Sequence, residues 1–147
     1  HEAVGRMLAG AATLAGHELA SERLAVALDS GVQEDEQSCF SDTTRQDFIW
    51  GLVGLKRVYY GRGRDESLAR TVARLQPRLA LEMERRFAEA ERRIAALHQP
   101  FDAILRAPEG SNTRAEAEAA ISALQSLAAG LREVGRALGV LVIVPGV

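Results

Sequence analysis

The spacing of apolar residues constrains this fold more than any other feature of the sequence. Apolar side chains recur every three to four residues through most of the chain, which is the period of a helix with one buried face. This pattern predicts helices over residues 2–28, 43–60, 66–75, 78–97 and 113–138. Short stretches rich in Gly, Pro, Ser and Asp separate them, as is typical of turns. Four or five helices joined by short connections predict an all-α, up-and-down helical bundle.

The length and charge of the chain narrow the classes of protein further. With 147 residues, 47% of them hydrophobic, the chain is long enough for one domain with its own core. A net charge of −2 disfavours binding to nucleic acid, because such proteins usually carry a basic excess. No uncharged apolar stretch reaches the roughly 18 residues of a membrane span. Cys39 is the only cysteine, so we expect a redox-silent thiol or a bridge to another segment.

Two carboxylates stand out on the first predicted helix. If each residue turns the helix by about 100°, Glu18 and Glu22 fall in the middle of its apolar face. Burying a carboxylate without a partner is costly, so a compensating group is expected. Three alternatives remain open: an ion pair with Arg23 or Arg57, a metal or ligand site, or a helix that emerges into solvent at Glu18.

A polar loop over residues 29–42 follows this helix and concentrates acidic side chains. We expect the loop to fold back beside the two glutamates and to add oxygen ligands, which suit hard cations or ferric iron. The alternative is a solvated acidic loop, although Phe40 indicates that part of the loop is anchored. The candidate metal ligands are Glu18, Glu22, Asp35, Glu36 and Asp42, and the candidate ligand-binding residues are Ser38, Asp47 and Arg23.

The helix predicted over residues 43–60 is apolar nearly all round, which favours a position where neighbours cover both sides. On it, Gly51 and Gly54 lie on one stripe with Asp47 and permit the close approach of another helix or of a ligand. The chain contains neither a zinc-binding His-Glu-x-x-His motif nor a nucleophile elbow or a phosphate-binding loop. No residue is therefore assigned a catalytic role.

Several runs of residues are similar to a known family. The chain contains Gly16-His-Glu-Leu-Ala-Ser-Glu-Arg23 and, after it, Gln33-Glu-Asp-Glu-Gln-Ser-Cys-Phe-Ser-Asp42. Further along follow Val58-Tyr-Tyr-Gly61, Pro100-Phe-Asp102 and a closing Ala-Leu-Gly-Val140. With these runs the chain resembles the imelysin family and, within it, the branch called iron-regulated protein A, and the resemblance extends over most of the chain.

The resemblance implies a fold of two similar helical bundles, of which residues 1–147 form one, the C-terminal bundle of a longer chain. The implied partners are the N-terminal bundle of the same protein and an envelope component of iron uptake. The resemblance also implies export to the periplasm or cell envelope, and a site between the bundles for iron or another divalent cation. Gln37 and Arg45 stand where this branch is expected to carry histidines, which favours a hard cation.

These observations predict an iron-regulated envelope protein that binds iron or an iron-containing ligand in iron uptake. Metallopeptidase activity is one alternative, since the family was first classed with such enzymes, although carboxylates alone are a poor zinc-binding set. A ligand-free docking module for an envelope partner is another. In that case the apolar tail over residues 140–144, expected to dock as an extended strand, and the helix over residues 43–60 would form the interface.

Overall fold

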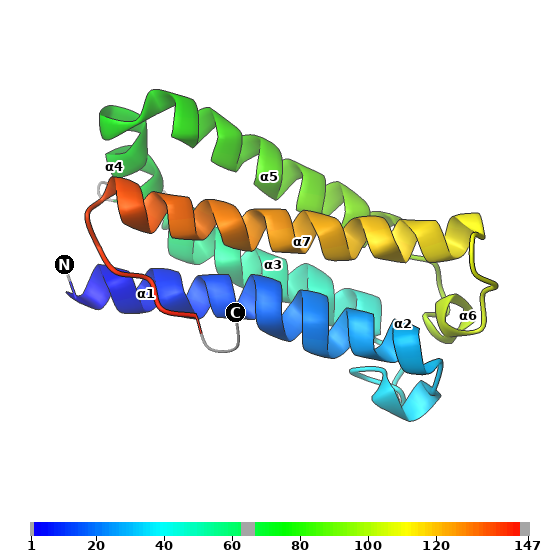
Figure 1. Cartoon of the computed structure of the whole chain (residues 1–147). Helices are drawn as coiled ribbons and strands as arrows, with labels where there is room; N and C mark the ends of the chain where they lie inside the picture. Colours follow the sequence, from blue (N-terminus) through cyan, green and yellow to red (C-terminus); the bar gives the residue numbers. More distant parts are fainter. Residues whose placement is uncertain (1, 63–66, 145–147) are drawn as a thin grey trace.

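The computed structural model describes residues 2–62 and 67–144. Every regular element within those ranges is a helix, and no strand occurs among them. The long helices lie side by side with alternating chain direction and form an elongated bundle (Figure 1). The all-α, up-and-down bundle predicted from the sequence is therefore confirmed.

The first rod of the bundle is one continuous helical segment made of three elements. These are α1 (Glu2–Ala12), η1 (Thr13–Ala25) and α2 (Val26–Ser30). Gly31 ends the rod with a φ of 66°, a left-handed conformation that glycine adopts without steric cost. A short 3₁₀ turn, η2 (Gln33–Asp35), follows in the acidic loop.

The later helices agree with the predicted ranges to within one or two residues, except that the sequence did not indicate the short helix α6. Residue 66, the predicted start of one helix, lies outside the described residues. Ser67 and Ser111 begin two of the helices by accepting hydrogen bonds from backbone N–H groups, which satisfies donors left free at a helix start. The elements are α3 (Thr44–Tyr60), α4 (Leu68–Leu75), α5 (Pro77–Ala96), α6 (Asp102–Leu105) and α7 (Asn112–Ala137).

The hydrophobic core lies between the four long helical segments of the bundle, which are the first rod, α3, α5 and α7. Helix α7 packs against both η1 and α5 along most of its length. Small side chains on α7, among them Ala120 and Ala128, are buried and let the neighbouring helices approach closely. Aromatic rings fill the space on the other side, where Tyr59 and Phe87 have ring centroids 5.4 Å apart. Helix α7 thus holds η1 in place along its length.

Helix α3 does not have both sides covered, contrary to the expectation from its sequence. Phe48, Leu52 and Leu55 are buried at helical spacing. Trp50, on the opposite side, is 60% exposed, and Val58 is 38% exposed. Because these apolar side chains stay exposed, composition alone overestimated how far the helix is buried.

The middle of the first rod, η1, is a π-helix of 13 residues, whereas most π-helical segments are single turns. Its hydrogen bonds reach five residues back: the N–H of Val26 donates to the carbonyl of Ser21. The hydroxyl of Ser21 donates in turn to the carbonyl of Gly16, at 3.0 Å. A turn of about 4.4 residues, wider than an α-turn, changes which side chains face the core. The buried residues from η1 into α2 are Ala15, Leu19, Ala20, Leu24, Ala27 and Leu28.

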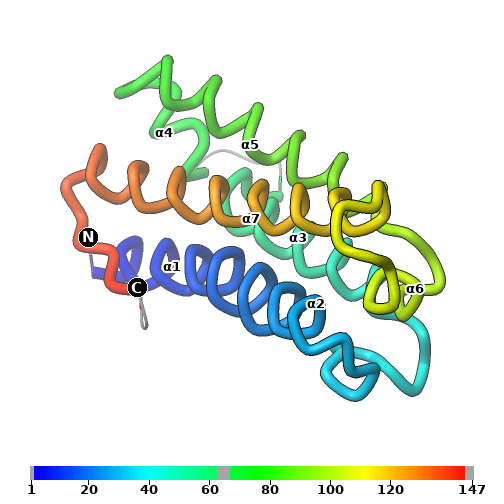
Figure 2. The backbone as a smooth tube through the Cα atoms, turned by 45° about the vertical axis from the view of Figure 1, so that its right-hand side comes forward, coloured from blue at the N-terminus to red at the C-terminus, as the bar shows by residue number. Residues whose placement is uncertain are grey.

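The segment after α7 folds back over the bundle and runs beside α1 (Figure 2). Gly139 has a φ of 66°, and the N–H of Val140 donates to the carbonyl of Gly135 at 2.9 Å, which reverses the chain direction. Two glycines make room for the returning chain. A Cβ on Gly5 would lie 2.9 Å from the carbonyl oxygen of Leu141, and a Cβ on Gly135 would lie 2.2 Å from Val142 Cγ2.

The tail over residues 140–144 has an inner and an outer side. Val140, Val142 and Val144 are half-buried and pack against the core, whereas Leu141 is 78% exposed and Ile143 is 68% exposed. The tail therefore docks in extended form, as expected, but against helices and without strand pairing among the described residues. None of the described helices is long and apolar enough to cross a membrane.

Candidate functional site

A pocket of about 540 Å³ opens between the end of the first rod and the acidic loop. Four of its lining side chains are carboxylates and one is a guanidinium, so the pocket is acidic overall. Such a surface favours a cation, or a ligand that presents cationic or hydrogen-donating groups. The residues that line it are Glu22, Arg23, Val26, Glu34, Asp35, Glu36, Gln37, Ser38, Cys39, Phe40 and Ser41.

Glu36 is the buried acid of this pocket, with 3% of its surface exposed. The hydroxyl of Thr44, at the start of α3, donates to Glu36 Oε1 at 2.5 Å and accepts from the N–H of Ser38 at 3.1 Å. Glu36 Oε2 is buried as well, and no described residue forms a hydrogen bond with it. Because an unpaired buried carboxylate oxygen is unfavourable, a cation or hydrogen-bond donor that reaches Glu36 would stabilise it more than it would the exposed acids of the pocket.

Hydroxyl groups hold the rest of the loop against the start of α3. The hydroxyl of Ser38 donates to Asp47 Oδ2, and Thr43 donates to the same oxygen at 3.5 Å. Ser41 and Thr43 share a further hydrogen bond of 2.9 Å between their hydroxyl oxygens. Asp47 therefore positions Ser38, which lines the pocket, and does not line the pocket itself.

The expectation that Glu18 and Glu22 both point into the core is wrong. Glu22 is exposed and lines the mouth of the acidic pocket. The side chain of Glu18 is 42% exposed and lies 3.7 Å from the guanidinium of Arg23, measured between Glu18 Oε2 and Arg23 Nη2. The wide turns of η1 rotate both residues out of the position that an α-helical wheel assigns to them. Three alternatives were predicted for these glutamates: an ion pair, a metal or ligand site, or exposure to solvent. For Glu18 the structure shows the ion pair with Arg23.

The structure gathers some of the predicted site residues and separates others. Glu22, Arg23, Asp35, Glu36 and Ser38 line one pocket. Glu18 and Asp42 do not line it, and Asp42 is exposed in the left-handed region, with a φ of 54°.

Some of the residues that line the acidic pocket were not predicted from the sequence. Glu34, Val26 and Cys39 line it; the acidic run signalled the first of these, and no pattern signalled the other two. Cys39 is half-buried and forms no disulfide. Phe40 is 99% exposed, so the expectation that it anchors the loop is wrong. The loop is instead anchored through the buried pair of Glu36 and Thr44.

The carboxylates of the pocket share a surface without meeting at one point. Across residues 2–62 and 67–144, no three His, Cys, Asp or Glu side chains come together in a way that could hold a metal ion. The pocket therefore offers scattered oxygen ligands around one buried carboxylate.

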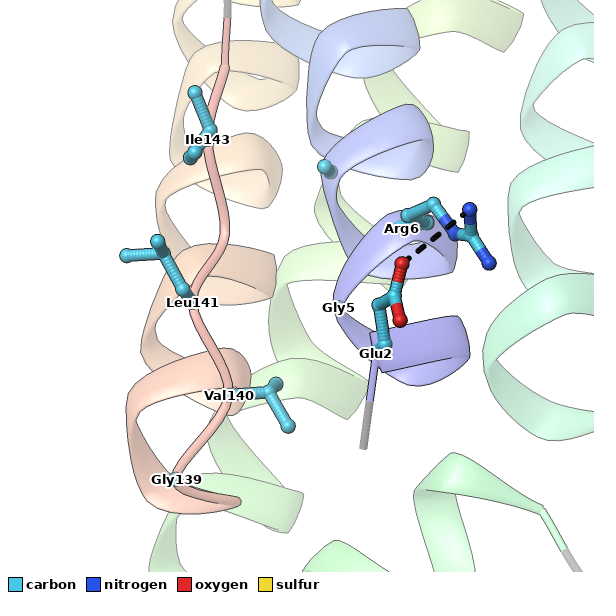
Figure 3. A pocket seen from close by; sticks show the side chains of 8 residues that line it. Glu2, Gly5, Arg6, Gly139, Val140, Leu141 and Ile143 are labelled. Atoms are coloured by element: carbon cyan, nitrogen blue, oxygen red, sulfur yellow. Dashed lines mark ion pairs between the residues drawn. The ribbon is translucent and has the colours of Figure 1, made fainter.

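A second hollow, of about 430 Å³, lies between α1 and the returning tail. Its charged groups, Glu2 and Arg6, pair with each other at 3.5 Å (Figure 3). Figure 3 also shows Val140 directed toward α1, while Leu141 and Ile143 point away from it. With its charges paired and most of its lining apolar, this hollow offers a ligand little beyond hydrophobic contact.

One comparison with known proteins identifies a family for this chain. Residues 1–129 match the sequence model of a family described as Imelysin (Peptidase_M75). Since the match covers most of the chain, the protein belongs to the imelysin family. No curated protein matches the chain. The family predicted from the sequence is thus confirmed, and the branch within it stays a prediction.

Proposed function

We propose that this protein binds an iron-containing ligand in the pocket between the first rod and the acidic loop, and that it serves iron uptake. The observation that carries the proposal is Glu36 Oε2, a buried carboxylate oxygen without a hydrogen-bond partner among the described residues, in a pocket with three further carboxylates. Carboxylate oxygens are hard ligands that suit ferric iron.

A coordinated ferric complex fits this pocket better than a bare ion. A bare ion needs several ligands that converge on one point, and no three metal-binding side chains converge among the described residues. A chelate brings most of its own ligands and needs only one or two more. The volume of about 540 Å³ suits a small chelate, and Arg23 supplies donors for its anionic groups.

The proposal includes a cellular setting. As a member of the iron-regulated protein A branch, the chain is the C-terminal bundle of an exported protein in the periplasm or cell envelope. The N-terminal bundle of the same protein covers the acidic pocket, and an envelope component of iron uptake receives the ligand. The acidic pocket supports this arrangement because it opens on the surface of the bundle rather than in its core.

The test is equilibrium dialysis of the chain against ferric nitrilotriacetate, with bound iron counted by mass spectrometry. The informative variant is Glu22→Gln/Glu36→Gln, which keeps the shape of both side chains and removes two carboxylates from the pocket. We expect binding to weaken by about tenfold or more, because charged ligand contacts contribute roughly 1.5–3 kcal/mol each.

The matched control is Glu2→Gln/Glu84→Gln, which removes two exposed acids from the first parts of α1 and α5, at the opposite end of the bundle from the acidic loop (Figure 1). This variant has the same net charge as the pocket variant and should bind as the parent does. Circular dichroism confirms that both variants stay helical. Equal binding by both variants, or no binding by the parent, would rule out the acidic pocket as an iron-complex site.

Docking of an envelope partner stays a second candidate, because Leu141 and Ile143 form an exposed apolar row on the outer side of the tail. The test is whether Leu141→Ser/Ile143→Ser abolishes capture of an envelope partner while the helices stay folded. Metallopeptidase activity has no observation in its favour among the described side chains. Chelator-sensitive cleavage of an unfolded protein substrate would establish it.

A further inference from the structure

A third hollow, of about 320 Å³, lies on the side of η1 that faces α7, and the proposed iron-complex site shares no lining residue with it. One wall comes from the end of α1 and from η1, another from α7, and the inner side of the tail closes it at Val144. Its polar side chains are His17, Ser21, Gln125 and Arg132. No acidic residue is among the residues that line it.

The π-helical geometry of η1 builds the first wall of this hollow. Ala12 and Ser21 are nine positions apart, which in an α-helix places them roughly 180° from each other. In a π-helix, with a turn of about 4.4 residues, the same two positions fall within about 20° of each other. Gly16 and His17 lie between them on that stripe. The wide turns therefore bring His17 and Ser21 to one side, above the small residues that leave space for a ligand.

Arg132 is the unusual charge of this hollow. Five arginines in the described part of the chain are half-buried: Arg45, Arg86, Arg93, Arg114 and Arg132. The first four bind a carboxylate or a backbone carbonyl, as Arg86 does with Glu82 at 3.0 Å. Arg132 has no hydrogen bond or ion pair with any described residue. A half-buried guanidinium without a counter-charge among the described residues favours an external anion.

We propose that this hollow binds a small organic carboxylate that carries a short apolar group. Arg132 supplies one fixed positive charge, which matches the single charge of a carboxylate and presents paired donors to its two oxygens. The side chains of Gln125 and His17 supply further N–H donors. Ala12, Ala128 and Val144 line the remainder and contact the apolar part of the ligand. Phosphate carries nearly two charges and has no apolar part, so it fits the lining less well.

The experiment is a calorimetric titration of the chain with butyrate, acetate and inorganic phosphate. Butyrate should bind more tightly than acetate by about fourfold for each methylene that becomes buried, and phosphate should bind more weakly than butyrate. Arg132→Gln should weaken butyrate binding by about tenfold or more, because it removes the charge and keeps most of the side-chain length. The matched control, Arg136→Gln, removes an exposed arginine one turn further along α7 and should bind butyrate as the parent does.

Further outcomes decide between this site and the acidic pocket. Glu22→Gln/Glu36→Gln should keep full affinity for butyrate, so a failure of the iron-complex proposal leaves this one standing. The carboxylate proposal is overturned if butyrate does not bind the parent, or if Arg132→Gln and Arg136→Gln weaken its binding equally. Phosphate binding as tight as butyrate binding would also overturn it, since charge alone would then explain the affinity.

Discussion

Replacing Thr44 by Val tests the buried link that shapes the acidic pocket. Thr44 is fully buried, and its hydroxyl joins Glu36 to the backbone N–H of Ser38, so the substitution leaves two polar partners unpaired with little change in volume. Losing a hydrogen bond to a charged group costs roughly 1.5–3 kcal/mol, and an unpaired N–H that is only partly buried adds about 1 kcal/mol. We expect the free energy of unfolding to fall by about 3 kcal/mol.

Urea denaturation followed by circular dichroism measures this loss. With a slope of about 2 kcal/mol per molar urea, the midpoint should fall by roughly 1.5 M while the slope stays constant. Thr113→Val is the matched control, because Thr113 is half-buried in the first turn of α7 and its hydroxyl bonds to no described residue. That variant should stay within about 0.5 kcal/mol of the parent. A loss below about 1 kcal/mol in Thr44→Val would show that the hydroxyl does not hold Glu36 in place.

Other predictions concern the core and the tail. Tyr59→Phe removes a buried hydroxyl with no partner among the described residues, so stability should stay equal or rise by about 1 kcal/mol in urea denaturation. Burial, together with Tyr60 and Glu84, holds the pKa of Tyr59 well above its ordinary value of 10.0. The parent should therefore lose stability as the pH rises above that value, and a pH titration of unfolding should show a smaller loss in Tyr59→Phe. Gly135→Ala places a Cβ against Val142 and should cost about 1–3 kcal/mol, measured by the same denaturation. Val142→Ser should also destabilise the bundle, whereas Leu141→Ser, on the outer side, should change the unfolding free energy by no more than about 0.5 kcal/mol.

The helical bundle followed from the sequence because α-helical periodicity is a local signal, but the first rod shows where that signal fails. A wheel of 100° per residue and a π-helix of roughly 82° per residue differ by half a turn after about ten residues. The wheel therefore placed Glu18 and Glu22 inside, and the structure buries Leu19 and Leu24 instead. The spacing of four to five residues between Leu19, Leu24 and Leu28 was the signal that pointed to wider turns.

The acidic pocket was predictable in part for a similar reason. The run of acids placed Asp35 and Glu36 in the right segment, and its distance from η1 along the chain was short enough to bring Glu22 beside it. Which acid is buried depends on Thr44, eight positions later, because the loop must turn to bring the two side chains together. The path of a loop follows from turn chemistry and tertiary contacts rather than from periodicity, so the sequence did not reveal this pair.

The returning tail couples the opening of α1 to the lifting of residues 140–144. The backbone of Leu141 passes so close to Gly5 that a Cβ would not fit between them, and Val140 packs on the core beside the same helix. Lifting the tail therefore exposes α1, and unwinding α1 removes the surface on which the tail rests. Deleting residues 140–144 should therefore speed hydrogen exchange of the α1 backbone amides, through an opening whose free energy is below that of global unfolding.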